Sequence, residues 1–125
     1  MAQTILLIED EPILQKTLSA ALQQEGYDIK NALDGEIGLN LAKEIKPDLI
    51  LLDLILPKMD GFEVLDALKG DDALKQIPVI VLTNLESPQD IEKALAKGAT
   101  TYLVKANYEL KNIIAKIQET IGAKK

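Results

Sequence analysis

Short apolar runs recur along the chain, and amphipathic stretches separate them. Continuous apolar runs occupy residues 4–8, 49–53, 78–83 and 101–104, and a weaker, alternating run occupies residues 27–32. Continuous runs of this length are typical of strands that are covered on both faces, whereas alternation is expected of a strand at a sheet edge. The pattern therefore predicts five strands, with residues 27–32 at an edge.

Helical periodicity fills the segments between the predicted strands. Leu14, Leu18 and Leu22 share one face of a helix that begins at Pro12 and ends before Gly26. Capping residues and periodicity predict further helices over residues 34–44, 60–69, 87–96 and 108–120. Strands that alternate with helices in this way predict an α/β fold, a parallel sheet with helices on both faces.

Composition narrows the class of protein. The 125 residues suffice for a single domain over residues 1–125, and the apolar share of 47% is typical of a globular chain. The net charge of −6 argues against binding to nucleic acid or an anionic membrane, since both need a basic surface. The N-terminus lacks the basic segment of a signal peptide, so we expect a soluble, cytoplasmic protein.

The absence of two residue types excludes several kinds of site. The chain has neither cysteine nor histidine. It can therefore form no disulfide framework and no thiolate or imidazole metal site, and it has no histidine general base. Any chemistry must rest on carboxylates, hydroxyls and ammonium groups.

Such groups stand where the inner strands end. Glu9 and Asp10 follow the first strand, Asp53 ends the third, Thr83 ends the fourth and Lys105 follows the fifth. Because the carboxyl ends of parallel strands meet at one edge of a sheet, we expect these side chains to converge. Clustered carboxylates suit Mg²⁺, and a carboxylate can attack phosphorus to give an aspartyl-phosphate. The hydroxyl and the ammonium could then stabilise phosphoryl oxygens, so Asp53 is the predicted reactive residue.

Four motifs, ILLIEDEP, LILLDLILPKMDG, PVIVLTN and GATTYLVK, span most of the chain. With them the sequence resembles the receiver domain of two-component response regulators. The resemblance implies a doubly wound, flavodoxin-like (βα)5 fold with strand order 2-1-3-4-5. It also implies a phosphorylatable regulatory domain that catalyses only its own phosphorylation and dephosphorylation, with Mg²⁺ or Mn²⁺ as cofactor.

The resemblance assigns a role to each matching residue. Asp53 corresponds to the phosphoacceptor, Lys105 to the phosphate-binding lysine, Thr83 to the switch hydroxyl and Tyr102 to the switch aromatic. The implied metal ligands are Glu9, Asp10, Asp53 and the backbone carbonyl of Ile55.

The resemblance also implies partners. The phosphoryl donor would be a histidine kinase or a histidine phosphotransfer protein, docking near the first helix and the Asp53 loop. Candidate exposed apolar contacts for this donor are Ile13, Leu14, Leu56 and Pro57. A downstream protein would read the face formed by the fourth helix, fifth strand and fifth helix, with the chain as a monomer or a weak, phosphorylation-linked dimer.

Several positions depart from the commonest family pattern. Ala106 stands where proline usually follows the lysine, so we expect a trans Lys105–Ala106 bond and a rearranged or more mobile loop before Asn107. Asn84 replaces a smaller residue and should narrow access to Asp53 or hydrogen-bond near the phosphoryl group. Ile55 and Leu85 are apolar, and they occupy positions whose side chains tune the rate of dephosphorylation in the family. We therefore hypothesise that the phosphoryl group is lost slowly.

Other interpretations of the same residues stay open. Taken singly, Glu9 and Asp10 suit a solvated helix N-terminus, Asp53 a cap, and Lys105 a solvated cation. The chain could also be a phosphorylation-independent receiver that serves only as an interaction module. A phosphatase of the haloacid-dehalogenase type would use similar residues, but it needs a second aspartate where this chain has Ile55.

Overall fold

The computed structural model describes residues 2–122, which form one sheet of five parallel strands. The strands are β1 (Thr4–Ile8), β2 (Asp28–Ala32), β3 (Leu49–Leu52), β4 (Val79–Thr83) and β5 (Thr101–Val104). Their order across the sheet is β2-β1-β3-β4-β5, as the resemblance implied, and β2 lies at an edge as its alternating pattern predicted. The carboxyl ends of all five strands therefore meet at one edge of the sheet.

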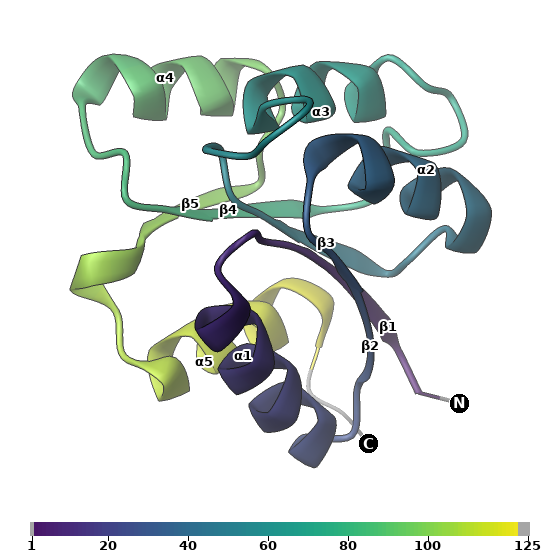
Figure 1. Cartoon of the computed structure of the whole chain (residues 1–125), viewed down its shortest axis with the longest axis vertical. Coiled ribbons are helices and arrows are strands. Elements are labelled where there is room, and N and C mark those ends of the chain that lie inside the picture. Colours follow the sequence, from purple (N-terminus) through teal and green to yellow (C-terminus); the bar gives the residue numbers. More distant parts are fainter. Residues whose placement is uncertain (1, 123–125) are drawn as a thin grey trace.

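Helices cover both faces of this sheet. They are α1 (Pro12–Gln24), α2 (Gly35–Ile45), α3 (Gly61–Lys69), α4 (Pro88–Ala96) and α5 (Leu110–Ile121). Figure 1 shows α2, α3 and α4 on one face and α1 with α5 on the other. The fold is thus the predicted doubly wound α/β sandwich. Among residues 2–122, none of the helices has the length and apolar character that a membrane crossing needs.

Alternate residues of each inner strand supply two separate cores. In β1, Ile5 and Leu7 pack in the cluster that includes residues of α1 and α5, whereas Leu6 and Ile8 pack in the cluster that includes residues of α2 and α3. All four side chains are at most 1% exposed. Full burial of such a side chain stabilises the fold by about 1.5–3 kcal/mol. The strands are consequently rigid supports for the residues at their tips.

Side-chain caps fix where three helices begin, as the sequence predicted. Asp60 and Glu63 form a reciprocal capping box at α3, since each side chain accepts a hydrogen bond from the other's backbone N–H. The carboxylate of Asp34 caps α2 and the hydroxyl of Ser87 caps α4. A cap of this kind contributes about 1 kcal/mol, so the helix starts are set by local sequence.

The start of α3 lies against the backbone of Asp53. A Cβ atom on Gly61 would lie 2.4 Å from the carbonyl oxygen of Asp53 and 2.5 Å from the Cα atom of Leu54. The Gly61 N–H also donates to the Leu54 carbonyl at 2.9 Å. Only glycine allows this approach, and the contact holds the turn after β3 in place.

Helix α4 meets α3 through charged side chains. Of the nine residues of α4, only Ala94 is buried. The Lys97 ammonium, just beyond α4, lies 2.8 Å from an Asp66 carboxylate oxygen, and the Lys93 ammonium lies 4.2 Å from the centre of the Phe62 ring. The α3–α4 junction therefore relies on one ion pair and one cation–π contact as well as on apolar packing.

The segment after β5 differs from the prediction in one respect. The Lys105–Ala106 bond is trans, as expected, and Lys105–Asn107 form a single 3₁₀ turn, η1. Helix α5 begins at Leu110 and not at Tyr108, so the predicted start was two residues early. Tyr108 has an extended backbone and packs against the core cluster of α1 and α5, which keeps it out of the helix.

Candidate functional site

The three carboxylates predicted to converge do lie together at the carboxyl edge of the sheet. Glu9, Asp10 and Asp53 each offer one oxygen, and these oxygens lie within 4.8 Å of one another. The backbone carries them there: the Asp53 N–H donates to the Ile8 carbonyl at 3.0 Å, and the Glu9 N–H donates to the Ala32 carbonyl at 3.0 Å. Both bonds continue the pairing of the strands by one residue, so the acids are placed by the sheet itself.

Glu9 and Asp53 are buried and use their oxygens in the same way. Glu9 is 1% exposed and Asp53 is 5% exposed, whereas Asp10 is exposed. One oxygen of Asp53 accepts a hydrogen bond from the Ile55 N–H at 3.2 Å, and one oxygen of Glu9 accepts from the Glu11 N–H at 3.1 Å. The other oxygen of each acid faces the Lys105 ammonium. Buried carboxylates need such partners, because an unpaired one would cost several kcal/mol.

Lys105 links the acids. Its Nζ atom lies 3.0 Å from Asp53, 2.9 Å from Glu9 and 2.6 Å from Glu11, and its side chain is only 12% exposed. Burial by itself would lower the pKa of Lys105, but its hydrogen bonds to Glu11 and Glu9 and the charge of Asp53 raise that pKa overall. The ammonium is therefore fully protonated at neutral pH.

The same environment raises the pKa of Glu9, although a neighbouring cation by itself would lower it. Burial, with a contribution from the Asp53 charge, raises the pKa of Glu9 from 4.5 to about 7, although hydrogen bonds from Lys105 and the Glu11 amide lower it in part. One ammonium does not compensate for several acids in so small a volume. The site therefore attracts further positive charge.

Thr83 ends β4 with a hydroxyl that is fully buried. Its side chain is 0% exposed, and among residues 2–122 its Oγ1 atom has no hydrogen-bond partner. A buried hydroxyl without a partner costs about 1–3 kcal/mol, so it is a group available for a ligand.

Tyr102 lies on β5 and is tied to the loop after β4. Its half-buried hydroxyl donates to the Leu85 carbonyl at 2.7 Å. Burial, followed by the charges of Asp90 and Asp53, raises the pKa of Tyr102 to about 12. The ring is thus connected to the segment that joins Thr83 to α4.

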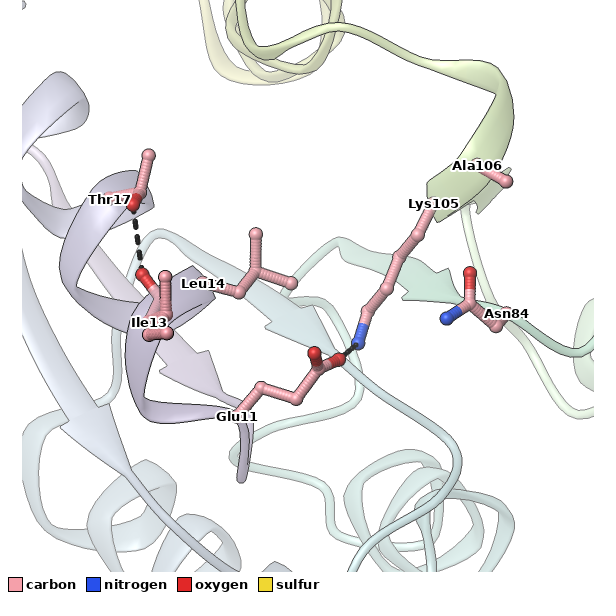
Figure 2. A pocket seen from close by; sticks show the side chains of 7 residues that line it. All are labelled: Glu11, Ile13, Leu14, Thr17, Asn84, Lys105 and Ala106. Atoms are coloured by element: carbon pink, nitrogen blue, oxygen red, sulfur yellow. Dashed lines mark hydrogen bonds and ion pairs between the residues drawn. The ribbon is translucent and has the colours of Figure 1, made fainter.

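Two of the positions that depart from the expected pattern, Asn84 and Ala106, line a pocket beside Lys105. An open pocket of about 460 Å³ is lined by Glu11 and Lys105, which contact each other, and by the exposed Asn84 (Figure 2). The remaining lining residues are Ile13, Leu14, Thr17 and Ala106. Asn84 lines this pocket together with Lys105, and its effect on access to Asp53 stays a prediction.

The apolar residues predicted at this edge differ in exposure. Ile55 is 56% exposed and Ile13 is 82% exposed, and Pro57 is also exposed. Leu14 and Leu56 are only half-buried neighbours of the core clusters, so they offer less free surface than expected. Leu85 packs against the core in the same way.

One residue at the site escaped the sequence analysis. Glu11 makes the shortest contact to Lys105, yet the sequence presents it only as the third acid of a run before a helix. The run itself was the available signal, because it places a third carboxylate directly after β1.

The donor set fits a hard divalent cation. Three carboxylates that converge within 4.8 Å, one of them exposed, match the preference of Mg²⁺ and Mn²⁺ for oxygen ligands. The unpartnered Thr83 hydroxyl and the Lys105 ammonium provide donors for an anion beside such a cation.

Comparisons with known proteins agree with this geometry. The family model of the response regulator receiver domain matches residues 5–118. The chain is 40% identical over 114 residues to the DNA-binding dual master transcriptional regulator RpaA of Synechocystis sp., a match that covers 91% of this chain and 47% of RpaA. The chain thus spans about half the length of this curated relative.

Solved structures of a receiver domain and of a response regulator are also similar to this chain. The receiver domain of sensor histidine kinase PA1611 from Pseudomonas aeruginosa, determined with a magnesium ion in its active-site cleft, matches with a TM-score of 0.88 and 30% identity, covering 98% of this chain and all of that one. The Mn²⁺-bound response regulator Rcp1 matches with a TM-score of 0.80 and 32% identity, covering 94% of this chain and 90% of that one.

Proposed function

Because the chain belongs to the response regulator receiver family of regulatory domains, we propose that it is a switch that accepts a phosphoryl group on Asp53. The observation that carries the proposal is the joint contact of Asp53 and Glu9 with Lys105, beside an Asp10 carboxylate that completes an acidic cluster. We also propose that residues 1–125 act as a single receiver domain in the cytoplasm.

Glu9, Asp10 and Asp53, whose oxygens converge, are the residues that would hold Mg²⁺ or Mn²⁺. The backbone carbonyl of Ile55 is the further ligand that the family resemblance implies. When bound, the ion supplies positive charge for the oxygens of the transferring phosphoryl group. The Mg²⁺-containing relative supports this assignment.

The reaction itself is a displacement at phosphorus. A carboxylate oxygen of Asp53 forms a bond to phosphorus, and the bond from phosphorus to the donor's nitrogen breaks, with its electron pair leaving on the donor. Lys105, already 3.0 Å from Asp53, interacts with a phosphoryl oxygen, and the Thr83 hydroxyl donates a hydrogen bond to another.

The response of the fold follows from the position of Thr83. Movement of the Thr83 hydroxyl toward the phosphoryl group shifts the loop after β4, and Tyr102 is bonded to that loop through the Leu85 carbonyl. The face of α4, β5 and α5 changes as a result, and a downstream protein reads the change as a population shift. Leu95, which is 46% exposed on α4, is one apolar residue available to such a partner.

The phosphoryl donor is a histidine kinase or a phosphotransfer protein. It would dock beside the start of α1 and the loop after β3, where Ile13 and Pro57 are exposed. The acidic composition supports protein partners and not nucleic acid.

Beryllofluoride, which mimics a phosphoryl group on a carboxylate, provides the test. In the presence of Mg²⁺ it should raise the melting temperature by several degrees, because a ligand that binds only the folded state stabilises it. Asp53→Asn should abolish the rise. Absence of a shift in the unmodified protein would favour the phosphorylation-independent interaction module, and catalytic turnover of phosphomonoesters would favour the phosphatase.

A further inference from the structure

Glu11 uses its carboxylate on Lys105 and not on the helix that it precedes. It is the N-cap residue of α1, a position where an acid ordinarily accepts a hydrogen bond from the first turn, yet its side chain makes no such bond. The carboxylate instead reaches a lysine 94 positions away, at 2.6 Å (Figure 2). The ordinary capping role does not account for this arrangement.

The three contacts saturate the ammonium group. A lysine ammonium has three hydrogens to donate, and Glu9, Glu11 and Asp53 lie at 2.9, 2.6 and 3.0 Å from Nζ. With 12% of the Lys105 side chain exposed, little room remains for a fourth partner. A phosphoryl oxygen that binds Lys105 must therefore replace one of the three carboxylates.

Glu11 is the partner that can leave at the lowest cost. Glu9 is 1% exposed and also accepts a backbone hydrogen bond, so releasing Lys105 from Glu9 would leave a buried charge poorly paired. Asp53 bears the phosphoryl group, so it stays beside Lys105 when the site is phosphorylated. The Glu11 side chain is 58% exposed, and water can solvate its carboxylate as soon as the contact breaks.

We propose that Glu11 is a positioning residue that competes with the phosphoryl group for Lys105. This inference rests on the proposed phosphorylation of Asp53 and adds that Glu11 releases Lys105 when the phosphoryl group binds. In the unphosphorylated protein Glu11 holds one hydrogen of the ammonium at the mouth of the pocket. On phosphorylation the phosphoryl oxygen takes that hydrogen and Glu11 turns to solvent. Glu11 thus sets how readily the site accepts its ligand.

The affinity for beryllofluoride in Mg²⁺, measured by fluorine NMR or calorimetry, tests the competition. Glu11→Gln should bind about two- to fivefold more tightly than the unmodified protein, the range expected for loss of one half-exposed ion pair. Glu11→Asp keeps the charge but shortens the side chain by one methylene, and it should tighten binding as well. Glu44→Gln is the matched control, since Glu44 is exposed on α2 and none of the ion pairs among residues 2–122 involves it. It should leave the affinity unchanged.

A double-mutant cycle with Lys105→Gln shows whether the effect runs through the lysine. In the Lys105→Gln background, Glu11→Gln should no longer tighten binding. The proposal is wrong if Glu11→Gln leaves affinity unchanged or weakens it, if Glu11→Asp behaves as the unmodified protein does, or if the effect persists without Lys105. Failure of the unmodified protein to bind beryllofluoride at all would instead refute the proposed function, so the two failures are distinct.

Discussion

Replacing Thr83 with valine should stabilise the unphosphorylated protein and weaken its response to a phosphoryl mimic. The Thr83 hydroxyl is fully buried and has no partner among residues 2–122. Such a group costs about 1–3 kcal/mol, and valine preserves the β-branched shape that suits a strand. Allowing for imperfect packing of the added methyl group, we expect the free energy of unfolding to rise by about 1 kcal/mol. For a chain of this size that corresponds to about 4 °C in melting temperature.

The opposite change is expected with beryllofluoride and Mg²⁺. A hydrogen bond to a charged group contributes about 1.5–3 kcal/mol, so the loss of the Thr83 donor should lower the affinity for the mimic by roughly 10- to 100-fold. Calorimetric melting with and without the mimic measures both effects on one sample. The two shifts have opposite signs, so a general loss of folding cannot imitate them.

Thr100→Val is the control for this experiment. Its hydroxyl accepts a hydrogen bond from the Val79 N–H at 3.2 Å, so its removal should destabilise the protein by about 1 kcal/mol. If Thr83→Val destabilised the protein by a similar amount, the Thr83 hydroxyl would have a partner in solution and the reasoning would be refuted. An unchanged affinity for beryllofluoride would refute its proposed role as a donor.

Three further predictions follow from the same site. Burial favours the protonated form of Glu9 and raises its pKa from 4.5 to about 7, so the contribution of Glu9 to stability should fall as the pH rises through that window. Stabilisation of the protein by Mg²⁺ should accordingly increase from about pH 5 to about pH 8. Melting temperatures of the unmodified protein and of Glu9→Gln, measured across this pH range, test both expectations, and an equal pH slope in the two proteins would contradict them. Gly61→Ala should lower the free energy of unfolding by about 1–3 kcal/mol in denaturant titrations, because its Cβ would lie 2.4 Å from the Asp53 carbonyl oxygen, and a neutral result would mean that the turn can relax. Phosphorylated Asp53 should decay over many minutes and Ile55→Asn should shorten its half-life several-fold, because an apolar residue cannot orient the attacking water; decay within seconds in the unmodified protein would refute the argument.

The sequence predicted the framework of the site because that framework depends on local signals. Apolar runs that stop at Asp53 and Thr83 define strand ends, and parallel pairing brings such ends to one edge. The caps at Asp34 and Asp60 likewise predict where helices begin, since the capping side chain bonds within its own turn.

The sequence predicted that side chains converge at this edge, but not which of them make each individual contact. Glu11 and Lys105 are 94 positions apart, and no local pattern indicates which of several acids lies closest to the ammonium. The start of α5 lies two residues after the predicted position for a related reason. Tyr108 is compatible with a helix by itself, and only its packing against the core of α1 and α5 gives it an extended backbone.

The contact between Lys93 and the ring of Phe62 has a spectroscopic consequence. Phe62 is the single phenylalanine of the chain, which has no tryptophan. Growth on fluorinated phenylalanine would therefore introduce one fluorine label, located at the α3–α4 junction with an ammonium 4.2 Å from the ring centre. Because fluorine chemical shifts respond strongly to nearby charge, one resonance would report the displacement of α4 relative to α3. A fluorine label at Phe62 would thus report on the position of α4, the helix that we expect to move.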